Sequence, residues 1–542
     1  METLLVIGNE LMKKLAKFDF SLTNKQFVWL GLVVIFLAVW LRFYKLGQVP
    51  HGMTWDEAAI GYNGYAIFTT RRDEWLKMLP VSFWSFGDYK APLAIYLNGF
   101  FTFLFGMTLF GVRLPFALAG VMAIIGFGLW LRLLLREFDY SVKQANFWSL
   151  VASLFMTLSP WHLHYSRAGF ESGMALSFFL WGLFFWQKFW QKVTATKNYW
   201  LILFTFSWVA AIYTYHSAKI VIPVVGLVLV WQKRSELKKK WSKFLTAGLL
   251  GVLGLLPFIY DSFFGKGLER AGTLIFSQGL SFFQLIKTIF YQLIAHLTPQ
   301  FLFFGQTTTL RHGDGVWGVL LLTTGLLGLL ALYDWLKTKN KLTSLALTLI
   351  LIGLLPAILA TEVPHSNRAL MSLPGFLLLA VVGLQQLLGL RSISKVWSLF
   401  LFAVAHLILV GGYLTNYYQN FAQASASDFQ DGYLAAFNYV IPYEKGWDNQ
   451  PAVDKIIFSS DYGQPYIYAL FARKTNPIWY QGGSLIKYEF KDEVTIGDLE
   501  RPNTIVVASE TDDLLSKNDQ ADKIIYGSDG SERFRIYLNL NK

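Results

Sequence analysis

The chain contains no cysteine, and only 15% of its 542 residues are charged. The absence of cysteine excludes disulfides, thiolate catalysis and cysteine-ligated metal sites. Soluble globular proteins carry about 25% charged residues, so the shortage of charge argues against a protein that is soluble throughout. A hydrophobic fraction of 54% and a mean hydropathy of +0.41 indicate instead a protein that lies largely in a membrane.

The charge that is present is divided unequally along the chain. Residues 425–542 hold 12 basic and 18 acidic residues, a net charge of −6, whereas the rest of the chain has a net charge of +18. Long apolar runs fill most of the first 418 residues. We therefore predict a transmembrane domain over 1–418 and a soluble domain over 419–542. The basic residues occur in short clusters between apolar runs, which fits membrane topology and argues against a nucleic-acid partner.

A helix needs about 20 apolar residues to cross the hydrocarbon, with roughly 17 tolerated, and the apolar runs predict eleven such helices. They are 27–44, 113–135, 147–163, 170–190, 199–215, 217–231, 244–260, 316–335, 343–360, 367–389 and 395–417. Two ambiguous apolar segments, 93–110 and 281–304, are predicted to lie at the outer surface. A span at 93–110 would move several basic clusters outside.

With eleven spans, every basic cluster faces the cytoplasm, as the positive-inside rule requires. These clusters are Lys13/Lys14/Lys17, Arg132/Arg136/Lys143, Lys188/Lys192/Lys197, Lys233/Arg234/Lys238–Lys240, Lys337/Lys339/Lys341 and Arg391/Lys395. We expect a multi-pass protein of the cell membrane with an uncleaved, cytoplasmic N-terminus and an extracytoplasmic tail. The outer side then receives the loop 45–112, the short polar turns between later spans, the loop 261–315 and the tail.

The tail has the pattern of a small α/β domain. The β-rich segments 454–460 and 504–508 predict strands, and 464–472 predicts a helix between them. Segments 523–526 and 533–538 flank the turn Gly527-Ser-Asp-Gly530 and predict a hairpin.

Two adjacent carboxylates, Asp56 and Glu57, follow the first predicted span by about ten residues. Ionisable groups near a bilayer are costly and commonly functional, and neighbouring carboxylates raise each other's pKa, which suits a proton acceptor. The alternative is that one of them caps a surface helix that starts at Thr54, because acidic residues favour the first turn. The loop alone favours neither.

Cations and further polar turns lie on the same predicted side. Lys90 and Arg113 could hold a lipid phosphate, although for a lone cation ordinary snorkelling at the membrane edge is the better explanation. The remaining candidates are Arg167, Glu171, Tyr215, His216, His365 and Arg368. Arg167 and Glu171 could be a merely structural i,i+4 pair. His162 and His164 have no third partner nearby, which argues against a metal site.

In this order the motifs resemble those of GT-C glycosyltransferases of the protein O-mannosyltransferase and aminoarabinose-transferase kind (glycosyltransferase family 39 type). The resemblance covers residues 27–418. It depends on Asp56-Glu57, the Lys-x-Pro-Leu motif at 90–93, the Arg-Leu-Pro motif at 113–115, the Ser-Pro…Ser-Arg…Glu turn at 159–171 and the Tyr-x-Tyr turn at 213–215. Two positions depart from the family: Ala91 precedes Pro92 where a second proline is common, and Glu171 stands where Asp is frequent. The tail does not resemble the β-trefoil domains of eukaryotic members.

The resemblance implies a GT-C membrane enzyme that transfers a mannose-like sugar, with inversion, from a polyprenyl phosphate to an acceptor hydroxyl at the outer face. The acceptor would be a protein, a lipid or a glycan. By the same resemblance, Asp56 is the base and Glu57 supports it, while Lys90, Arg113 and Arg368 neutralise the phosphate. Glu171 would orient the acceptor or Arg167. Oligosaccharyltransferases of the superfamily use a divalent metal and the mannosyltransferase branch does not, so we expect no obligate metal or other cofactor.

Two other functions are consistent with part of the pattern. A ligase of the lipid-A type would transfer a glycan to a lipid or cell-wall acceptor with the same motifs. A transporter would need polar or broken helices near the bilayer midplane and internal pseudo-symmetry. The predicted spans are almost purely apolar in their middle sections, so the sequence favours chemistry at one surface.

Overall fold

The computed structural model describes residues 20–191, 199–265, 272–389, 395–446, 450–481, 483, 485–512 and 521–540. The chain divides into two compact units. A helical unit contains the first helix, Phe116–Ser166 and Phe170–Asn416; a mixed unit contains Lys45–Pro115, Arg167–Gly169 and the tail from Tyr417. The tail thus begins close to the predicted boundary at 418, and the first outer loop belongs to the same unit as the tail.

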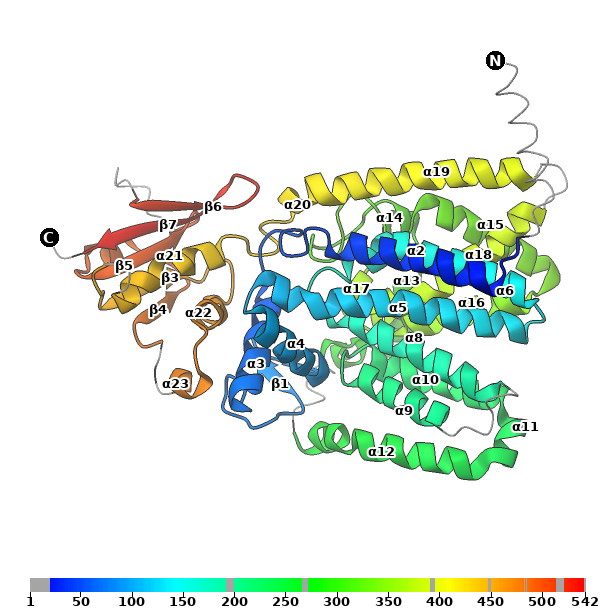
Figure 1. The fold of residues 1–542 in the computed structure, drawn as a ribbon. Helices are drawn as coiled ribbons and strands as arrows, with labels where there is room; N and C mark the ends of the chain where they lie inside the picture. Colours follow the sequence, from blue (N-terminus) through cyan, green and yellow to red (C-terminus); the bar gives the residue numbers. More distant parts are fainter. Residues whose placement is uncertain are drawn as a thin grey trace, which may run out of the picture. The chain divides into compact units, whose positions relative to one another are not determined.

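The helical unit consists of long apolar helices that run alongside one another (Figure 1). Its elements are α2 (Asn24–Phe43), α5 (Leu109–Glu137, which enters this unit after Pro115), α6 (Val142–Leu158), α7 (Pro160–His164), α8 (Glu171–Trp190), α9 (Tyr199–Ile212), α10 (Ala218–Gln232), α11 (Arg234–Leu237), η1 (Lys238–Lys240), α12 (Trp241–Phe264), η3 (Ile275–Gln278), α13 (Phe282–Ala295), α14 (Pro299–Phe303), α15 (Leu322–Thr338), α16 (Lys341–Ile358), α17 (Ser366–Ala369), η4 (Leu370–Ser372), α18 (Leu373–Gly389) and α19 (Lys395–Thr415).

Each of the eleven segments predicted to span the membrane contains a helix, so the predicted polytopic helical fold is confirmed. By length and composition, six helical stretches of the described residues could cross a membrane. They are Asn24–Phe43, Leu109–Glu137, Arg234–Phe264, Lys341–Ile358, Ser366–Gly389 and Lys395–Ala424. The number of eleven spans remains a prediction.

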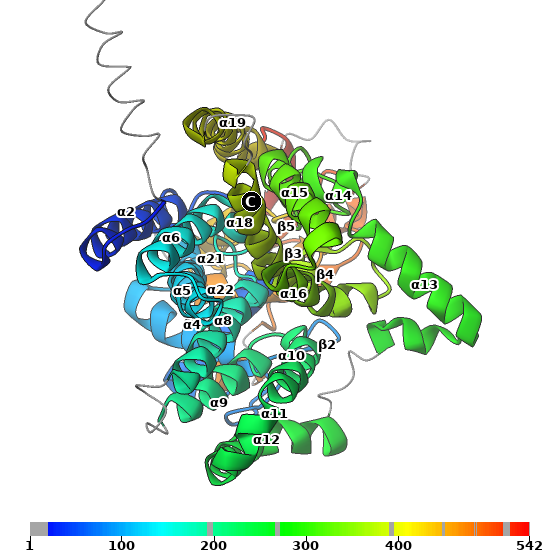
Figure 2. The ribbon, with the colours of Figure 1, turned by 90° about the vertical axis from the view of Figure 1, so that its right-hand side faces the viewer.

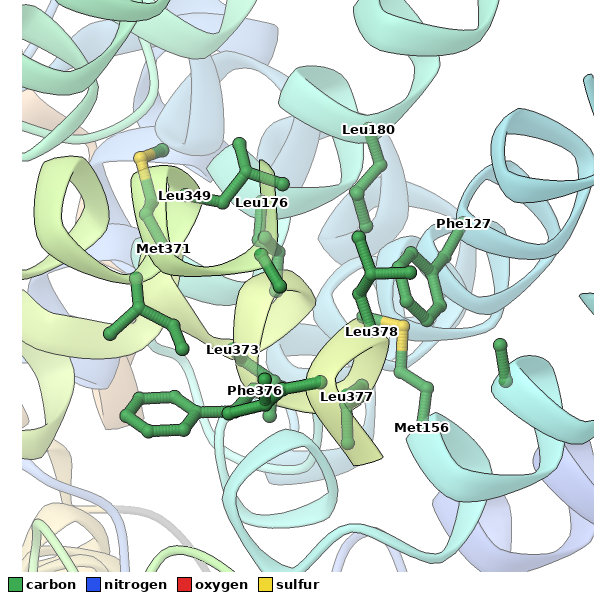
Figure 3. Close-up of a cluster of buried hydrophobic side chains, with 14 of the residues drawn as sticks. Phe127, Met156, Leu176, Leu180, Leu349, Met371, Leu373, Phe376, Leu377 and Leu378 are labelled. Carbon is green, nitrogen blue, oxygen red and sulfur yellow. The ribbon is translucent and has the colours of Figure 1, made fainter. Parts of the chain in front are cut away.

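The core of the helical unit is centred on α18, which packs against α15 and α16. Figure 3 shows Leu373, Leu377 and Leu378 of α18 among Phe127 of α5 and Met156 of α6. Gly383 allows the close approach, because a Cβ there would lie 1.8 Å from the carbonyl oxygen of Leu327. The helix is buried on almost every side, which explains its continuous apolar sequence.

Four of the predicted basic clusters lie at one end of the helical unit. The ends of α5, α8 and α10 and the start of α16 border one cavity there, with Glu137, Gln187, Lys233 and Lys341 among its lining residues. If the chain crosses the membrane in the predicted order, these four clusters must lie on the same side of the membrane. Their position at a common end agrees with that order. Lys13/Lys14/Lys17, Lys192, Lys197 and Arg391 lie outside the described residues.

The helices α12 and α13 lie at the periphery of the helical unit (Figure 2). The exposed side chains of α13 are mainly aromatic and aliphatic, among them Phe283, Phe290 and Tyr291. At about 1.5 Å per residue, the 14 residues of α13 reach about 21 Å, short of a hydrocarbon core about 30 Å thick. The 14-residue helix α4 has the same limit. The helix α9, in a segment predicted to span the membrane, also has 14 residues, so helix length does not distinguish the two classes. The surface position of the segments 93–110 and 281–304 stays a prediction.

The mixed unit combines the first loop with the tail. Its elements are α3 (Trp55–Thr70), β1 (Phe83–Ser85), β2 (Asp88–Lys90), α4 (Pro92–Phe105), the π-helical turn η5 (Asn416–Asn420, whose first residue belongs to the helical unit), α20 (Phe421–Ala424), α21 (Tyr433–Lys445), β3 (Lys455–Ser459), α22 (Pro465–Arg473), α23 (Pro477–Gln481), β4 (Tyr488–Lys491), η6 (Ile496–Glu500), β5 (Thr504–Ser509), β6 (Lys523–Tyr526) and β7 (Glu532–Asn539). The predicted strands 454–460 and 504–508, the helix 464–472 and the C-terminal hairpin are confirmed.

The tail forms a five-stranded sheet in the order β4-β3-β5-β7-β6, in which β3 is parallel to β4 and β5. Alternate side chains of β3 point to opposite faces: Ile456 and Phe458 join one core with α21, α22 and α3, whereas Ile457 joins a second core with Val494. The first loop therefore shares a hydrophobic core with the tail, and the helix α3 packs directly on α22.

We expect the loop at Asp56 and the tail to lie outside the cytoplasm. Both Ser235 in α11 and Ser427 after α20 are exposed. In this cysteine-free chain, a cysteine at Ser427 should react with a membrane-impermeant maleimide in intact cells. A cysteine at Ser235 should react only after the membrane is opened. The reverse labelling would invert the topology.

Candidate active site

The helix α3 begins with a closed capping box. The backbone N–H of Glu57 donates to Thr54 Oγ1 at 3.2 Å, and the backbone N–H of Thr54 donates to Glu57 Oε2 at 3.1 Å. This reciprocal pair satisfies two amides that a helix start otherwise leaves without partners. The capping alternative raised by the sequence is therefore correct for Glu57.

Glu57 also forms a buried ion pair with Arg113. Arg113 Nε donates to Glu57 Oε1 at 2.7 Å and Nη2 donates to Oε2 at 3.1 Å, and both side chains are almost completely buried. The remaining guanidinium protons go to backbone carbonyls of the first loop, with Pro50 at 2.8 Å and Gly52 at 2.9 Å. The backbone N–H of Gly169 adds a further donor to Glu57 at 2.9 Å. Arg113 is thus fully engaged in holding the loop.

Asp56 has a different environment although it is the adjacent residue. Its side chain is 43% exposed and forms an ion pair with Lys90, whose own side chain is only 7% exposed. Lys90 ends the strand β2, which the two-stranded β1–β2 hairpin places opposite Phe83, and its ammonium lies 5.8 Å from the centre of the Phe86 ring. The site therefore presents an accessible carboxylate beside a cation that is held by a rigid hairpin.

Arg167 lies in the same unit. It is fully buried, donates to the carbonyl of Val49 at 3.1 Å and stacks over the ring of Tyr418 at 5.0 Å. The structure thus brings Asp56, Glu57, Lys90, Arg113 and Arg167 into one unit.

The tail supports the helix that carries the acidic pair. The hydroxyl of Tyr468 in α22 donates to the carbonyl of Met53 at 2.7 Å, just before α3. The hydroxyl of Tyr62 in α3 donates to the carbonyl of Thr475 at 2.8 Å. Gly463 permits contact with Trp55, because a Cβ there would lie 2.5 Å from the indole.

A second acidic pair, Asp73-Glu74, was missed by the sequence reasoning, although it lies in the same loop. Both residues are fully buried. Glu74 Oε1 accepts from Asn63 Nδ2 at 3.1 Å and from Ser85 Oγ at 3.0 Å, and Tyr466 also hydrogen-bonds this carboxyl. Burial raises the pKa of Glu74 to about 7. Glu74 therefore joins α3, β1 and α22 through a carboxyl that titrates near neutrality.

The helical unit contains a separate cluster of polar turns. The hydroxyl of Tyr165 lies 2.7 Å from Ser366 Oγ and 3.1 Å from His312 Nδ1, and Ser366 Oγ donates to the carbonyl of His312 at 2.5 Å. The rings of His312 and His365 have their centres 4.5 Å apart. The sequence did not predict His312, Ser366 and Tyr165 as site residues. The one feature of the sequence that could have indicated them is their position on polar turns.

His365 and Arg368 flank Glu362. His365 Nε2 lies 3.5 Å from Glu362 Oε2, and Arg368 Nη2 lies 3.7 Å from the same oxygen. Burial, with nearby His312 and Arg368, lowers the pKa of His365 to about 2. The imidazole is therefore neutral at physiological pH, and the contact with Glu362 is a neutral one rather than an ion pair. The positive charge beside Glu362 therefore comes from Arg368.

The turn at Tyr215 and His216 belongs to this second cluster. Tyr215 is buried beside Tyr165, and Ser217 Oγ donates to the carbonyl of Arg368 at 3.3 Å. Glu171, the first residue of α8, is half-buried in the same unit. The turns that carry Tyr165, Ser217 and Ser366 thus contact one another.

Within the described part of the chain, no group of three or more His, Asp or Glu side chains is arranged to hold a metal ion.

No protein-family model and no curated protein matches the chain. Among solved structures, the apo form of ArnT from Cupriavidus metallidurans is similar over 95% of this chain and 97% of its own, with 13% identity and a TM-score of 0.51. ArnT from the same organism bound to undecaprenyl phosphate has a TM-score of 0.49, at 13% identity over 94% of this chain and 98% of that chain. The archaeal oligosaccharyltransferase AglB from Archaeoglobus fulgidus, in complex with an inhibitory peptide and a dolichol-phosphate, also has a TM-score of 0.49, at 13% identity over 82% of this chain and 63% of that chain. The first likeness confirms the predicted resemblance at the level of the fold.

The raised pKa of Glu74 predicts a pH-dependent stability. Its pKa is about 7 in the folded protein against an ordinary 4.5, so the folded state holds the proton more tightly. Stability should therefore fall by up to about 3 kcal/mol as the pH rises from about 4.5 to 7 and then level off. Thermal melts of the wild type should show this decline, and Glu74→Gln should flatten it. An equally steep decline in the variant would assign the effect to other groups.

Proposed function

We propose that the chain is an integral membrane glycosyltransferase that moves a sugar from a polyprenyl-phosphate donor to an acceptor hydroxyl at the outer face of the membrane, with inversion. The observation that carries the proposal is the contrast between the two neighbouring carboxylates. Asp56 is exposed beside the cation Lys90, whereas Glu57 is buried and satisfied by Arg113 and backbone amides. The ArnT-like fold and the order of the motifs support the donor class.

In this proposal Asp56 acts as the general base. Its carboxylate accepts the proton of the acceptor hydroxyl, the acceptor oxygen forms a bond to the anomeric carbon, and the bond from that carbon to the phosphate oxygen breaks. The electron pair leaves with the polyprenyl phosphate. A positioned base of this kind contributes roughly 10²–10⁴-fold to the rate.

Lys90 is proposed to neutralise the departing phosphate. Its charge is close to Asp56, it is held in place by the β1–β2 hairpin, and a fixed cation stabilises charge that develops on a leaving group. Arg368 is proposed as a second phosphate ligand and Glu171 as a group that orients the acceptor, as the motif order implies. The donors of Arg113 are engaged by Glu57 and carbonyls. We therefore propose that Arg113 acts on the reaction by positioning the loop.

Asp56→Asn should lower turnover by roughly 10²–10⁴-fold while donor binding changes little, because the amide keeps the shape and loses the basicity. Purified enzyme assayed with a panel of polyprenyl-phosphate-linked sugars measures both quantities. Asp88→Asn, on the same loop, is the matched control and should retain activity. Near-normal turnover of Asp56→Asn would reject the base, and no turnover of any such donor by the wild type would reject the proposed function.

Lys90→Met and Arg113→Met should fail in different ways. Lys90→Met should raise the donor KM and lower kcat with little change in the thermal melt, because it removes a cation from an exposed partner. Arg113→Met leaves the buried Glu57 unpaired and should destabilise the mixed unit by about 3–5 kcal/mol. If Arg113→Met leaves the thermal melt unchanged and raises the donor KM, Arg113 binds the phosphate and does not act by positioning the loop.

A further inference from the structure

A cavity of about 610 Å³ lies at the end of the helical unit where α5, α8 and α10 end and α16 begins. The polar turns at Tyr215 and His365 adjoin the opposite ends of α10 and α16. The cavity therefore does not belong to the candidate active site. Its volume falls within the range of about 300–1,000 Å³ that small-molecule sites occupy.

The floor of the cavity is apolar. It is lined by buried side chains from all four helices, including Trp130 of α5, Leu183 of α8, Val225 of α10 and Leu349 of α16. Figure 3 shows Leu349 beside Leu176 and Met371 in the core of the unit. This apolar part of the lining can accept a hydrocarbon group.

The mouth of the cavity carries two charges of each sign. Glu137 forms an ion pair with Lys233 and accepts a hydrogen bond from Gln187. Asp139 and Lys341 also line the mouth, and both are exposed. Neither side chain has a hydrogen-bond or ion-pair partner within the described ranges. A carboxylate and an ammonium without such partners thus line the same cavity as the Glu137–Lys233 ion pair.

We propose that this cavity binds one zwitterionic phospholipid. An acyl chain would lie against the apolar floor, the lipid phosphate at Lys341, and the lipid ammonium at Asp139. Charge-assisted contacts of both signs would then be made at once. An anionic phospholipid without an amine would satisfy Lys341 and offer no cation to Asp139. The four helix ends bring the mouth to the level of the headgroups, where such a lipid is supplied from the bilayer.

The proposal is tested on the full-length protein in mild detergent by native mass spectrometry with added phosphatidylethanolamine, phosphatidylcholine or phosphatidylglycerol. Both zwitterionic lipids should bind in stoichiometric amount, and phosphatidylglycerol should bind about tenfold more weakly, the factor that corresponds to about 1.4 kcal/mol. Equal binding of phosphatidylglycerol, or no retained lipid of any class, would overturn the proposal. Binding of only one zwitterionic lipid would support it and identify the headgroup.

Two pairs of variants locate the lipid. Leu349→Trp fills the floor and should abolish binding, whereas Leu351→Trp, half-exposed on the same helix, should not. At the surface, where folding is not at risk, Asp139→Asn and Lys341→Gln should each weaken binding of zwitterionic lipid about tenfold. The matched controls Asp334→Asn and Lys339→Gln lie outside the cavity and should leave binding unchanged. Equal losses in variants and controls would place the lipid elsewhere.

Discussion

The buried ion pair between Glu57 and Arg113 is the interaction on which the candidate site depends. Removing two charges from water is costly, and the cost is offset only where every donor and acceptor is satisfied. Here the carboxylate accepts from Arg113 and from the amides of Thr54 and Gly169, while the guanidinium also reaches the carbonyls of Pro50 and Gly52. One pair therefore ties the start of α3 to the chain before it and to the segment at Gly169. The direction in which Asp56 points follows from that restraint.

The two adjacent carboxylates have different environments because they lie on a helix. Successive side chains of an α-helix are turned by about 100°, so when Glu57 points into the protein Asp56 points away from it. The sequence shows the pair and the helix start, and it leaves open whether the pair caps that helix or takes part in chemistry. The sequence does not show which of the two carboxylates is buried. That depends on Arg113, which lies 56 positions after Glu57 and forms its ion pair with Glu57. The capping interpretation is confirmed for Glu57, and a catalytic role for Asp56 remains a proposal.

The features predictable from the sequence are those that depend on local composition. Apolar length predicted a helix in every segment from 27–44 to 395–417, and β-branched runs predicted β3 and β5. The short strands β1 and β4 have too few residues to show a period. The burial of Glu74 depends on Asn63, Ser85 and Tyr466, which come from three separate elements, so no local pattern reveals it. The shared core of the first loop and the tail is likewise a product of distant contacts.

Because the tail shares this core with the first loop, its structural role differs from that of an independent domain. By composition it is a separate soluble domain, and a separate domain would commonly bind a partner or an acceptor. In the structure, Tyr468 holds the carbonyl of Met53, Tyr62 holds that of Thr475, and α22 packs on the helix that carries Asp56. Buried hydrogen bonds of this kind across a core favour a single arrangement. The tail is therefore part of the scaffold of the acidic loop. Substitutions more than 400 positions from Asp56 act on the same structural unit as substitutions beside it.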